Sequence, residues 1–188
     1  MNASIIWPLA LVYIVSELAV TFKRRAKTAE SRDEDRGSLI LIWIVIVSSA
    51  ALAVGLAHVL PAAAMPSAAT LRVIGVALFW AGLLVRWYAI IHLGRFFTVD
   101  VAIAANHRLI TTGPYRVVRH PSYTGALMAF LGLALCQANW ASLVVLIVPV
   151  FLVFLRRMRI EEAALLRAFG EQYRDYMNRT KRLIPAVY

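Results

Sequence analysis

Ten consecutive residues in the second half of this chain combine side chains that could do chemistry, and they lie between apolar runs. They read Arg116-Val117-Val118-Arg119-His120-Pro121-Ser122-Tyr123-Thr124-Gly125. Polar groups at a membrane boundary cost free energy unless a partner satisfies them. A cluster that combines cations, an imidazole and hydroxyl groups therefore indicates either a structural partner or a bound ligand.

His120 stands at a position where an anion could bind. Pro121 suits the first turn of a helix, so His120 directly precedes a predicted helix N-terminus, with Ser122 and Tyr123 on the first turn. Free backbone N–H groups at such an end favour a carboxylate or a phosphate. Two plainer interpretations compete with a binding site: a helix-start histidine satisfied by backbone, and interfacial anchoring of Tyr115 and Tyr123.

A second candidate constellation lies forty residues further along the chain. Arg157 and Glu161 are four residues apart and share one face of a helix. They could form an ordinary surface ion pair worth a few tenths of a kcal/mol. They could also present a cation and an anion together to a zwitterionic ligand or to two ligands. Glu162 lies about 100° further round the helix and would face elsewhere.

The composition indicates an integral membrane protein. The 188 residues are 61% hydrophobic, with a mean hydropathy of +0.72. The net charge is +10, but the basic residues lie between or after apolar runs, which is typical of cytoplasmic loops and not of a nucleic-acid-binding surface. We therefore predict no nucleic-acid partner. The histidines show no metal-ligand spacing, so we also predict no metal site.

Five apolar segments predict an all-α membrane protein with about five transmembrane helices. They cover residues 4–22, 39–60, 71–93, 123–138 and 140–155. The last two are short for a span of about 20 residues. They either extend past their ends, with Arg156 and Arg159 snorkelling to the interface, or form a shallow hairpin. Residues 137–139 make the turn in both cases.

The charges of the connections predict the orientation. Basic connections at 23–36 and 95–119 and a basic tail at 156–182 alternate with uncharged connections at 61–69 and 137–139. The positive-inside rule therefore places the N-terminus outside, and the C-terminus and the polar clusters in the cytoplasm.

We expect a single domain over residues 1–188, with three spans in 1–92 and the candidate site in 93–188. Apolar residues at near-helical spacing predict a further helix over residues 159–178, beyond the last span. Glu17 and Arg86 lie deep within apolar runs, and intramembrane ionisable groups are functional candidates that could pair with each other.

Four motifs in residues 90–188 carry a family resemblance. They are His107-x-Leu109-Ile110-x-x-Gly113-Pro114-Tyr115, Arg119-His120-Pro121-Ser122-Tyr123-x-Gly125, Glu161-Glu162, and Phe169-Gly170-Glu171-x-Tyr173-x-x-Tyr176. In combination they resemble the isoprenylcysteine carboxyl methyltransferases, and the related phospholipid methyltransferases share their core. The first two spans carry no motif.

The resemblance implies a small helical membrane enzyme that uses S-adenosylmethionine, with a cytosol-facing cofactor pocket and a lateral opening through which a lipophilic substrate enters from the bilayer. The matching positions imply cofactor contacts at His107, Leu109, Ile110, Tyr115, His120, Tyr123 and Glu161. Arg157 matches the arginine expected to hold the substrate carboxylate. The short chain is similar to prokaryotic members, which implies an inner or plasma membrane.

The chemistry of the cofactor fits these roles. Glu161 suits the ammonium group of S-adenosylmethionine, and His120 suits its carboxylate. Tyr115 and Tyr123 could pack on the adenine or near the sulfonium. A carboxylate acceptor needs no general base, because it is already anionic; it needs alignment with the methyl group and exclusion of water. Arg157 could position it.

Three functional hypotheses follow. The first is methylation of the carboxylate of an isoprenylcysteine or a similar lipophilic molecule. The second keeps the enzyme but changes the acceptor to a phospholipid amine or a thiol, and an amine would need a base such as Glu162 or His107. The third is a non-enzymatic membrane scaffold whose basic faces bind anionic lipid.

Overall fold

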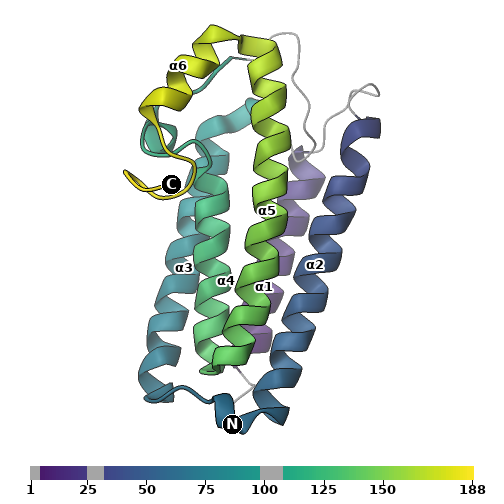
Figure 1. Cartoon of the computed structure of the whole chain (residues 1–188), viewed down its shortest axis with the longest axis vertical. Coiled ribbons are helices and arrows are strands. Elements are labelled where there is room, and N and C mark those ends of the chain that lie inside the picture. Colours follow the sequence, from purple (N-terminus) through teal and green to yellow (C-terminus); the bar gives the residue numbers. More distant parts are fainter. Residues whose placement is uncertain (1–4, 25–31, 98–107) are drawn as a thin grey trace.

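The computed structural model describes residues 5–24, 32–97 and 108–188 of the chain. Helices dominate these residues: α1 Ile6–Arg24, α2 Arg32–Val59, α3 Ala68–Leu93, α4 Pro121–Gln137, α5 Trp140–Phe169 and α6 Glu171–Arg179. Short 3₁₀ turns occur at η3 Pro61–Ala63, η4 Gly94–Phe96 and η5 Gly113–Arg116. The first five helices lie side by side along one long axis, and α6 folds over one end of the bundle (Figure 1).

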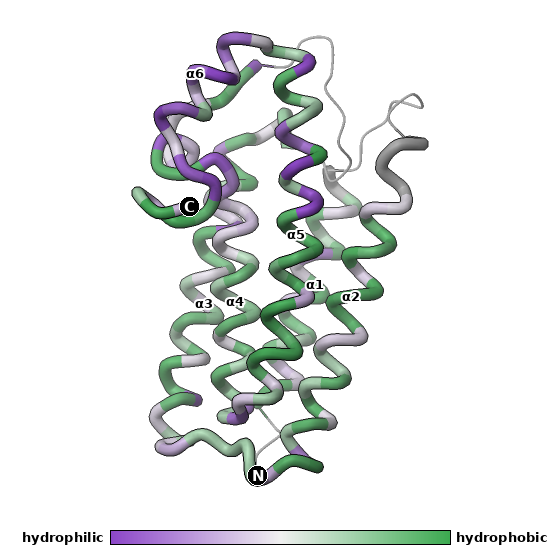
Figure 2. Tube along the Cα trace, in the orientation of Figure 1, coloured by the Kyte–Doolittle hydropathy of each residue, from purple (hydrophilic) through white to green (hydrophobic). Residues whose placement is uncertain are grey.

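The long helices make the chain an integral membrane protein. Three of them hold segments long and apolar enough to cross a membrane: Gly37–Val59, Ala68–Leu93 and Trp140–Phe169. Hydrophobic residues run along the bundle, whereas hydrophilic residues gather around α6 and the adjoining end of α5 (Figure 2). The predicted all-α membrane fold is therefore confirmed. The count of five spans stays a prediction, because α1 and α4 are shorter apolar helices.

Glycines allow α3 and α4 to pack backbone against backbone. Gly75 faces Gly132 and Gly82 faces Gly125, so the two helices run antiparallel. A Cβ on Gly132 would lie 2.5 Å from the carbonyl oxygen of Gly75. Such close approach maximises dispersion contacts between helices in lipid, where no hydrophobic effect drives them together. This packing fixes the start of α4, and with it His120, against the C-terminal half of α3.

The turn between α4 and α5 is confirmed at residues 137–139. Ala138 takes a left-handed conformation with φ 47°, and the Asn139 side chain accepts a hydrogen bond from the backbone N–H of Ser142 at 3.1 Å. Asn139 Nδ2 also donates to the carbonyl of Leu60 at 3.0 Å. The Ser142 hydroxyl donates to the carbonyl of Ala53 at 2.7 Å, which joins α5 to α2.

The prediction that residues 159–178 are helical is confirmed except at Gly170, but its boundaries are wrong, because these residues do not form one helix of their own. α5 continues without a break to Phe169, because no Pro or Gly interrupts residues 156–169. Gly170, with φ +52°, ends α5 and starts the short α6. The extension matters for the site, because Arg157, Glu161 and Glu162 all lie on one rigid helix.

We expect the substitution Gly132→Ala to destabilise the protein by about 1–3 kcal/mol, because its Cβ would force α3 and α4 apart. Thermal unfolding in detergent measures the change. Gly55→Ala in α2 is the matched control, since a Cβ there meets nothing within 4 Å. It should leave the midpoint unchanged or slightly higher, because alanine favours the helix. Equal midpoints for the two variants would contradict the close packing.

Candidate active site

Side chains from the bundle, the segment before α4 and α6 line a partly open cavity of about 210 Å³. An ordered water needs roughly 10–15 Å³, so this space can hold a ligand many times larger than a water molecule. The polar side chains of its wall include Glu17, Arg86, His120, Tyr123, Arg157 and Glu161. Its apolar wall includes Val20 of α1, Leu39, Ile42 and Trp43 of α2, and Leu109 and Ile110 of the segment before α4.

Glu161 presents its carboxylate to this cavity. The Tyr123 hydroxyl donates a hydrogen bond to Glu161 Oε1 at 2.5 Å, and Arg157 Nε lies 3.4 Å from the same oxygen. Arg157 is 1% exposed, whereas the Glu161 side chain is 27% exposed. The interpretation of this i,i+4 pair as an ordinary surface ion pair is therefore wrong, and a buried cation and a more accessible anion line the same space.

The His120 ring lies between two carboxylates. His120 Nε2 is 3.2 Å from Glu162 Oε1, and Nδ1 is 3.6 Å from Glu161 Oε2. His120 is the N-cap residue of α4, with Pro121 in the first turn as predicted. The imidazole is buried and meets the Tyr123 ring edge-on at 5.7 Å between centroids. The contact with Glu162 and the Tyr123 ring thus hold the imidazole in place, with Nδ1 towards Glu161.

Glu162 does not line the cavity and instead binds a cluster of basic residues. Arg119 Nε donates to Glu162 Oε1 at 3.1 Å, and Arg182 donates to both carboxylate oxygens at 2.7–3.1 Å. Glu162 is 4% exposed and does not line the cavity. Its hydrogen bond raises the pKa of Arg182. The suggested role of Glu162 as a base for an amine acceptor is therefore unsupported, since its oxygens hold the two arginines.

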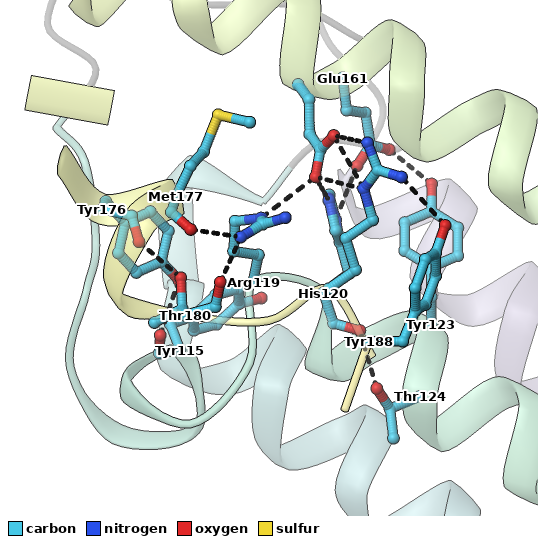
Figure 3. A network of polar contacts seen from close by, with 12 residues as sticks. Tyr115, Arg119, His120, Tyr123, Thr124, Glu161, Tyr176, Met177, Thr180 and Tyr188 are labelled. Carbon is cyan, nitrogen blue, oxygen red and sulfur yellow. Dashed lines mark hydrogen bonds and ion pairs between the residues drawn. The ribbon is translucent and has the colours of Figure 1, made fainter. Parts of the chain in front are cut away.

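Residues 181–188, which we call the C-terminal clip, bind the start of α4. The backbone N–H groups of Arg119 and His120 donate to the carbonyls of Lys181 and Arg182 at 2.7 and 3.0 Å. Thr124 Oγ1 donates to the carbonyl of Leu183 at 2.9 Å. Figure 3 shows Arg119 at the centre of this network, where it also donates to the carbonyls of Met177 and Thr180.

Tyr115 closes the cavity from the segment before α4. It lies in η5, which begins at the predicted Gly113-Pro114 turn, and its ring stacks on His92 at 6.4 Å between centroids. The Tyr176 hydroxyl of α6 donates to the Tyr115 carbonyl at 2.6 Å. Burial raises the pKa of Tyr176 to about 12, so the hydroxyl remains a donor at neutral pH. Contrary to simple interfacial anchoring, Tyr115 is buried.

The structure brings together almost all of the predicted site residues. These are Leu109, Ile110, Tyr115, His120, Tyr123, Arg157 and Glu161, which all line the cavity. His107 lies outside the described residues. The expectation that Glu17 and Arg86 could pair is confirmed, and both line the cavity. The sequence analysis named Ser122, Tyr173 and Tyr176 in its motifs but assigned none of them to the site, although all three line the cavity. The i,i+3 spacing of the two tyrosines was the available signal.

Comparison with known proteins identifies the family. The model of the family described as phospholipid methyltransferase matches residues 70–172, which is more than half of the chain. The chain belongs to this family. The matched segment includes Arg86, His120, Arg157 and Glu161, whereas α1 and the C-terminal clip lie outside it.

Individual relatives carry a narrower name. The chain is 35% identical over 115 residues to protein-S-isoprenylcysteine O-methyltransferase B of Arabidopsis thaliana, covering 60% of this chain and 58% of that relative. It is 33% identical over 108 residues to the protein-S-isoprenylcysteine O-methyltransferase of Schizosaccharomyces pombe, covering 56% and 46%. The chain thus spans less than two thirds of the length of these relatives.

A solved structure shares the fold. It is described as the eukaryotic intramembrane Ras methyltransferase ICMT (isoprenylcysteine carboxyl methyltransferase), and the match has a TM-score of 0.64 at 30% identity. The match covers 77% of this chain and 52% of that one. The arrangement of helices in this chain therefore agrees with that of a methyltransferase that lies within the membrane.

We expect Glu162→Gln to destabilise the protein by about 3–5 kcal/mol, because two arginines would lose their buried counter-charge. Hydrogen exchange should show faster exchange in the C-terminal clip. Glu171→Gln, which removes an exposed carboxylate paired with Arg174, should change stability by only about 0–1 kcal/mol. Unchanged exchange at residues 181–188 in Glu162→Gln would show that Glu162 does not hold the clip.

Proposed function

We propose that this protein is an integral membrane methyltransferase that transfers a methyl group from S-adenosylmethionine to the carboxylate of an isoprenylcysteine or a similar lipophilic acceptor. One observation carries the proposal: a single cavity combines Arg157, Glu161 and His120 with an apolar wall from α1 and α2. The names of the relatives at 33–35% identity support the same reaction class.

The charged and polar side chains of the cavity fit the amino-acid end of S-adenosylmethionine. Glu161, an accessible carboxylate in the cavity, would bind the ammonium group. His120 Nδ1 would bind the carboxylate, since its 3.6 Å distance to Glu161 exceeds a hydrogen bond. Leu109, Ile110 and the rings of Tyr115 and Tyr123 would pack on the adenosine. The bound cofactor supplies an electrophilic methyl group on its sulfonium.

The other wall of the cavity suits a lipophilic acceptor. Val20 of α1 and Ile42 and Trp43 of α2 give it an apolar surface, and the exposed faces of these helices are hydrophobic. Transfer of an acyl or prenyl chain from water to this surface would be favourable by roughly 0.8 kcal/mol per buried CH₂. The acceptor comes from lipid, however, so the main role of its chain is to position the acceptor carboxylate beside the methyl donor. Arg157 would then orient the acceptor carboxylate towards the methyl group.

The charges in the cavity favour an anionic acceptor over an amine. An amine must lose a proton before it attacks, so it needs a base beside the methyl group. Among the described residues that line the cavity, the carboxylates are Glu17 and Glu161, and each is paired with an arginine. A carboxylate acceptor avoids this requirement, because it needs only alignment and exclusion of water.

The basic end of the bundle would face the cytoplasm, from which the water-soluble S-adenosylmethionine can reach the cavity. The positive-inside rule supports this orientation, with the N-terminus outside, in a prokaryotic inner or plasma membrane. Residues 1–188 would form one domain, in which 93–188 bind the cofactor. Of the three N-terminal helices, α1 and α2 would contribute the acceptor wall, since their apolar residues line the cavity.

A methyl-transfer assay with purified protein in lipid nanodiscs tests the proposal. N-acetyl-S-farnesylcysteine should be methylated, and its farnesylcysteine methyl-ester analogue, which has no free carboxylate, should not. A phospholipid amine should accept no methyl group at neutral pH. Methylation of the amine with none of the farnesylated acid would overturn the carboxylate assignment, and no transfer to any member of the panel would overturn the proposed enzyme.

Three variants divide the roles in the same assay. Glu161→Gln should raise KM for S-adenosylmethionine about tenfold or more, through loss of a charge-assisted hydrogen bond. Arg157→Gln should raise KM for the acceptor and lower kcat by about 10²-fold, since a misplaced acceptor loses alignment. Glu171→Gln, an exposed carboxylate on α6, is the control and should behave as the unaltered protein.

A further inference from the structure

An ion pair joins α1 to the wall of the cavity. Arg86 of α3 donates through Nε and Nη2 to the two carboxylate oxygens of Glu17, at 2.5 and 2.6 Å. The side chains are each 12% exposed. Glu17 lies outside the segment that matches the family model, whereas Arg86 lies inside it. The reaction that we propose gives neither residue a contact with cofactor or acceptor, so their role is open.

The same guanidinium also binds the first turn of α4. Arg86 Nη1 donates to the Ser122 hydroxyl at 2.9 Å and to the Ser122 carbonyl at 3.1 Å. A planar guanidinium can serve both groups at once, because its five N–H donors point in fixed directions. Glu17 occupies one edge of the plane, so the remaining edge is aimed at Ser122.

Ser122 connects this contact to the candidate site through its neighbour. Tyr123 follows directly on the helix, and its hydroxyl donates to Glu161 at 2.5 Å. The Tyr123 ring packs edge-on against Phe154 at 5.1 Å and against His120 at 5.7 Å. Since these rings leave Tyr123 little freedom of its own, the position of its hydroxyl follows the position of the first turn of α4.

We propose that Arg86 is a positioning residue, oriented by Glu17, that holds the first turn of α4 so that Tyr123 keeps the Glu161 carboxylate in place for the cofactor. α1 is then part of the site, since it supplies the residue that orients Arg86. The inference rests on the proposed function, because it assigns to Arg86 and Glu17 a role in binding the methyl donor.

A second contact between the same helices provides a matched control. Trp87 Nε1 donates to the Ser16 hydroxyl at 2.6 Å. Trp87 follows Arg86 on α3, and Ser16 precedes Glu17 on α1. This contact also docks α1 on α3, but neither side chain lines the cavity. Ser16→Ala therefore weakens the docking of α1 without touching Arg86 or Ser122.

Calorimetric titration with S-adenosylhomocysteine, the demethylated cofactor, tests the proposal on full-length protein in nanodiscs, with thermal unfolding of each variant in parallel. Glu17→Gln and Arg86→Lys should each raise Kd by about tenfold, because lysine cannot serve Glu17 and Ser122 together. Ser16→Ala should lower the unfolding temperature slightly and leave Kd unchanged.

The double variant Glu17→Arg with Arg86→Glu separates positioning from docking. It keeps an ion pair between α1 and α3 but places no donor beside the Ser122 carbonyl. We expect its unfolding temperature to recover relative to the single variants while its Kd stays about tenfold raised. Recovery of both would show that the pair only docks α1 and would overturn the proposal.

The remaining outcomes are also decisive. If the unaltered protein binds S-adenosylhomocysteine and both Glu17→Gln and Arg86→Lys bind it equally well, the positioning role is overturned and the proposed function stands. If the unaltered protein does not bind it, the proposed function fails and this inference fails with it. A Kd for Ser16→Ala that rises as much as that of Glu17→Gln would also overturn the positioning role.

Discussion

The contact on which the site depends is the His120 ring between the carboxylates of two successive residues of α5. Glu161 and Glu162 diverge by about 100° because they are neighbours on a helix. One faces the cavity and the other faces the basic cluster of Arg119 and Arg182. His120 meets both, at 3.6 and 3.2 Å. A single turn of α5 therefore positions the accessible carboxylate of the cavity. Through Glu162 it also holds the C-terminal clip, which binds the backbone of the same histidine.

A membrane setting explains why these polar groups are so completely paired. In lipid, every buried charge or backbone group needs an internal partner, and unpaired ones are costly. Arg86 meets Glu17 and Ser122, and Glu162 meets two arginines and a histidine. The close glycine packing of α3 and α4 gives the rigid frame on which these pairs are mounted. Polar groups thus gather at one end of the bundle, where α6 and the clip cover them (Figures 1 and 2).

Local rules predicted most of the elements, and the family resemblance indicated which residues share the site. Pro121 marked the start of α4, residues 137–139 marked a turn, and the i,i+4 spacing put Arg157 and Glu161 on one face. The sequence could not place Glu162 against Arg182 or Tyr176 against Tyr115, because those contacts join distant parts of the chain and leave no period in it. The end of α5 was missed for a different reason: charged residues at 156–162 resemble an interfacial break, yet only Gly170 stops the helix.

The most direct test of the account is an experimental structure of the full chain in lipid with S-adenosylhomocysteine bound. We predict that the ligand occupies the cavity, with its ammonium group within hydrogen-bond distance of Glu161 and its carboxylate beside His120. We also predict that the apolar wall from α1 and α2 stays open to an acceptor. A ligand bound outside this cavity, or one whose amino-acid end lies away from both Glu161 and His120, would contradict the account.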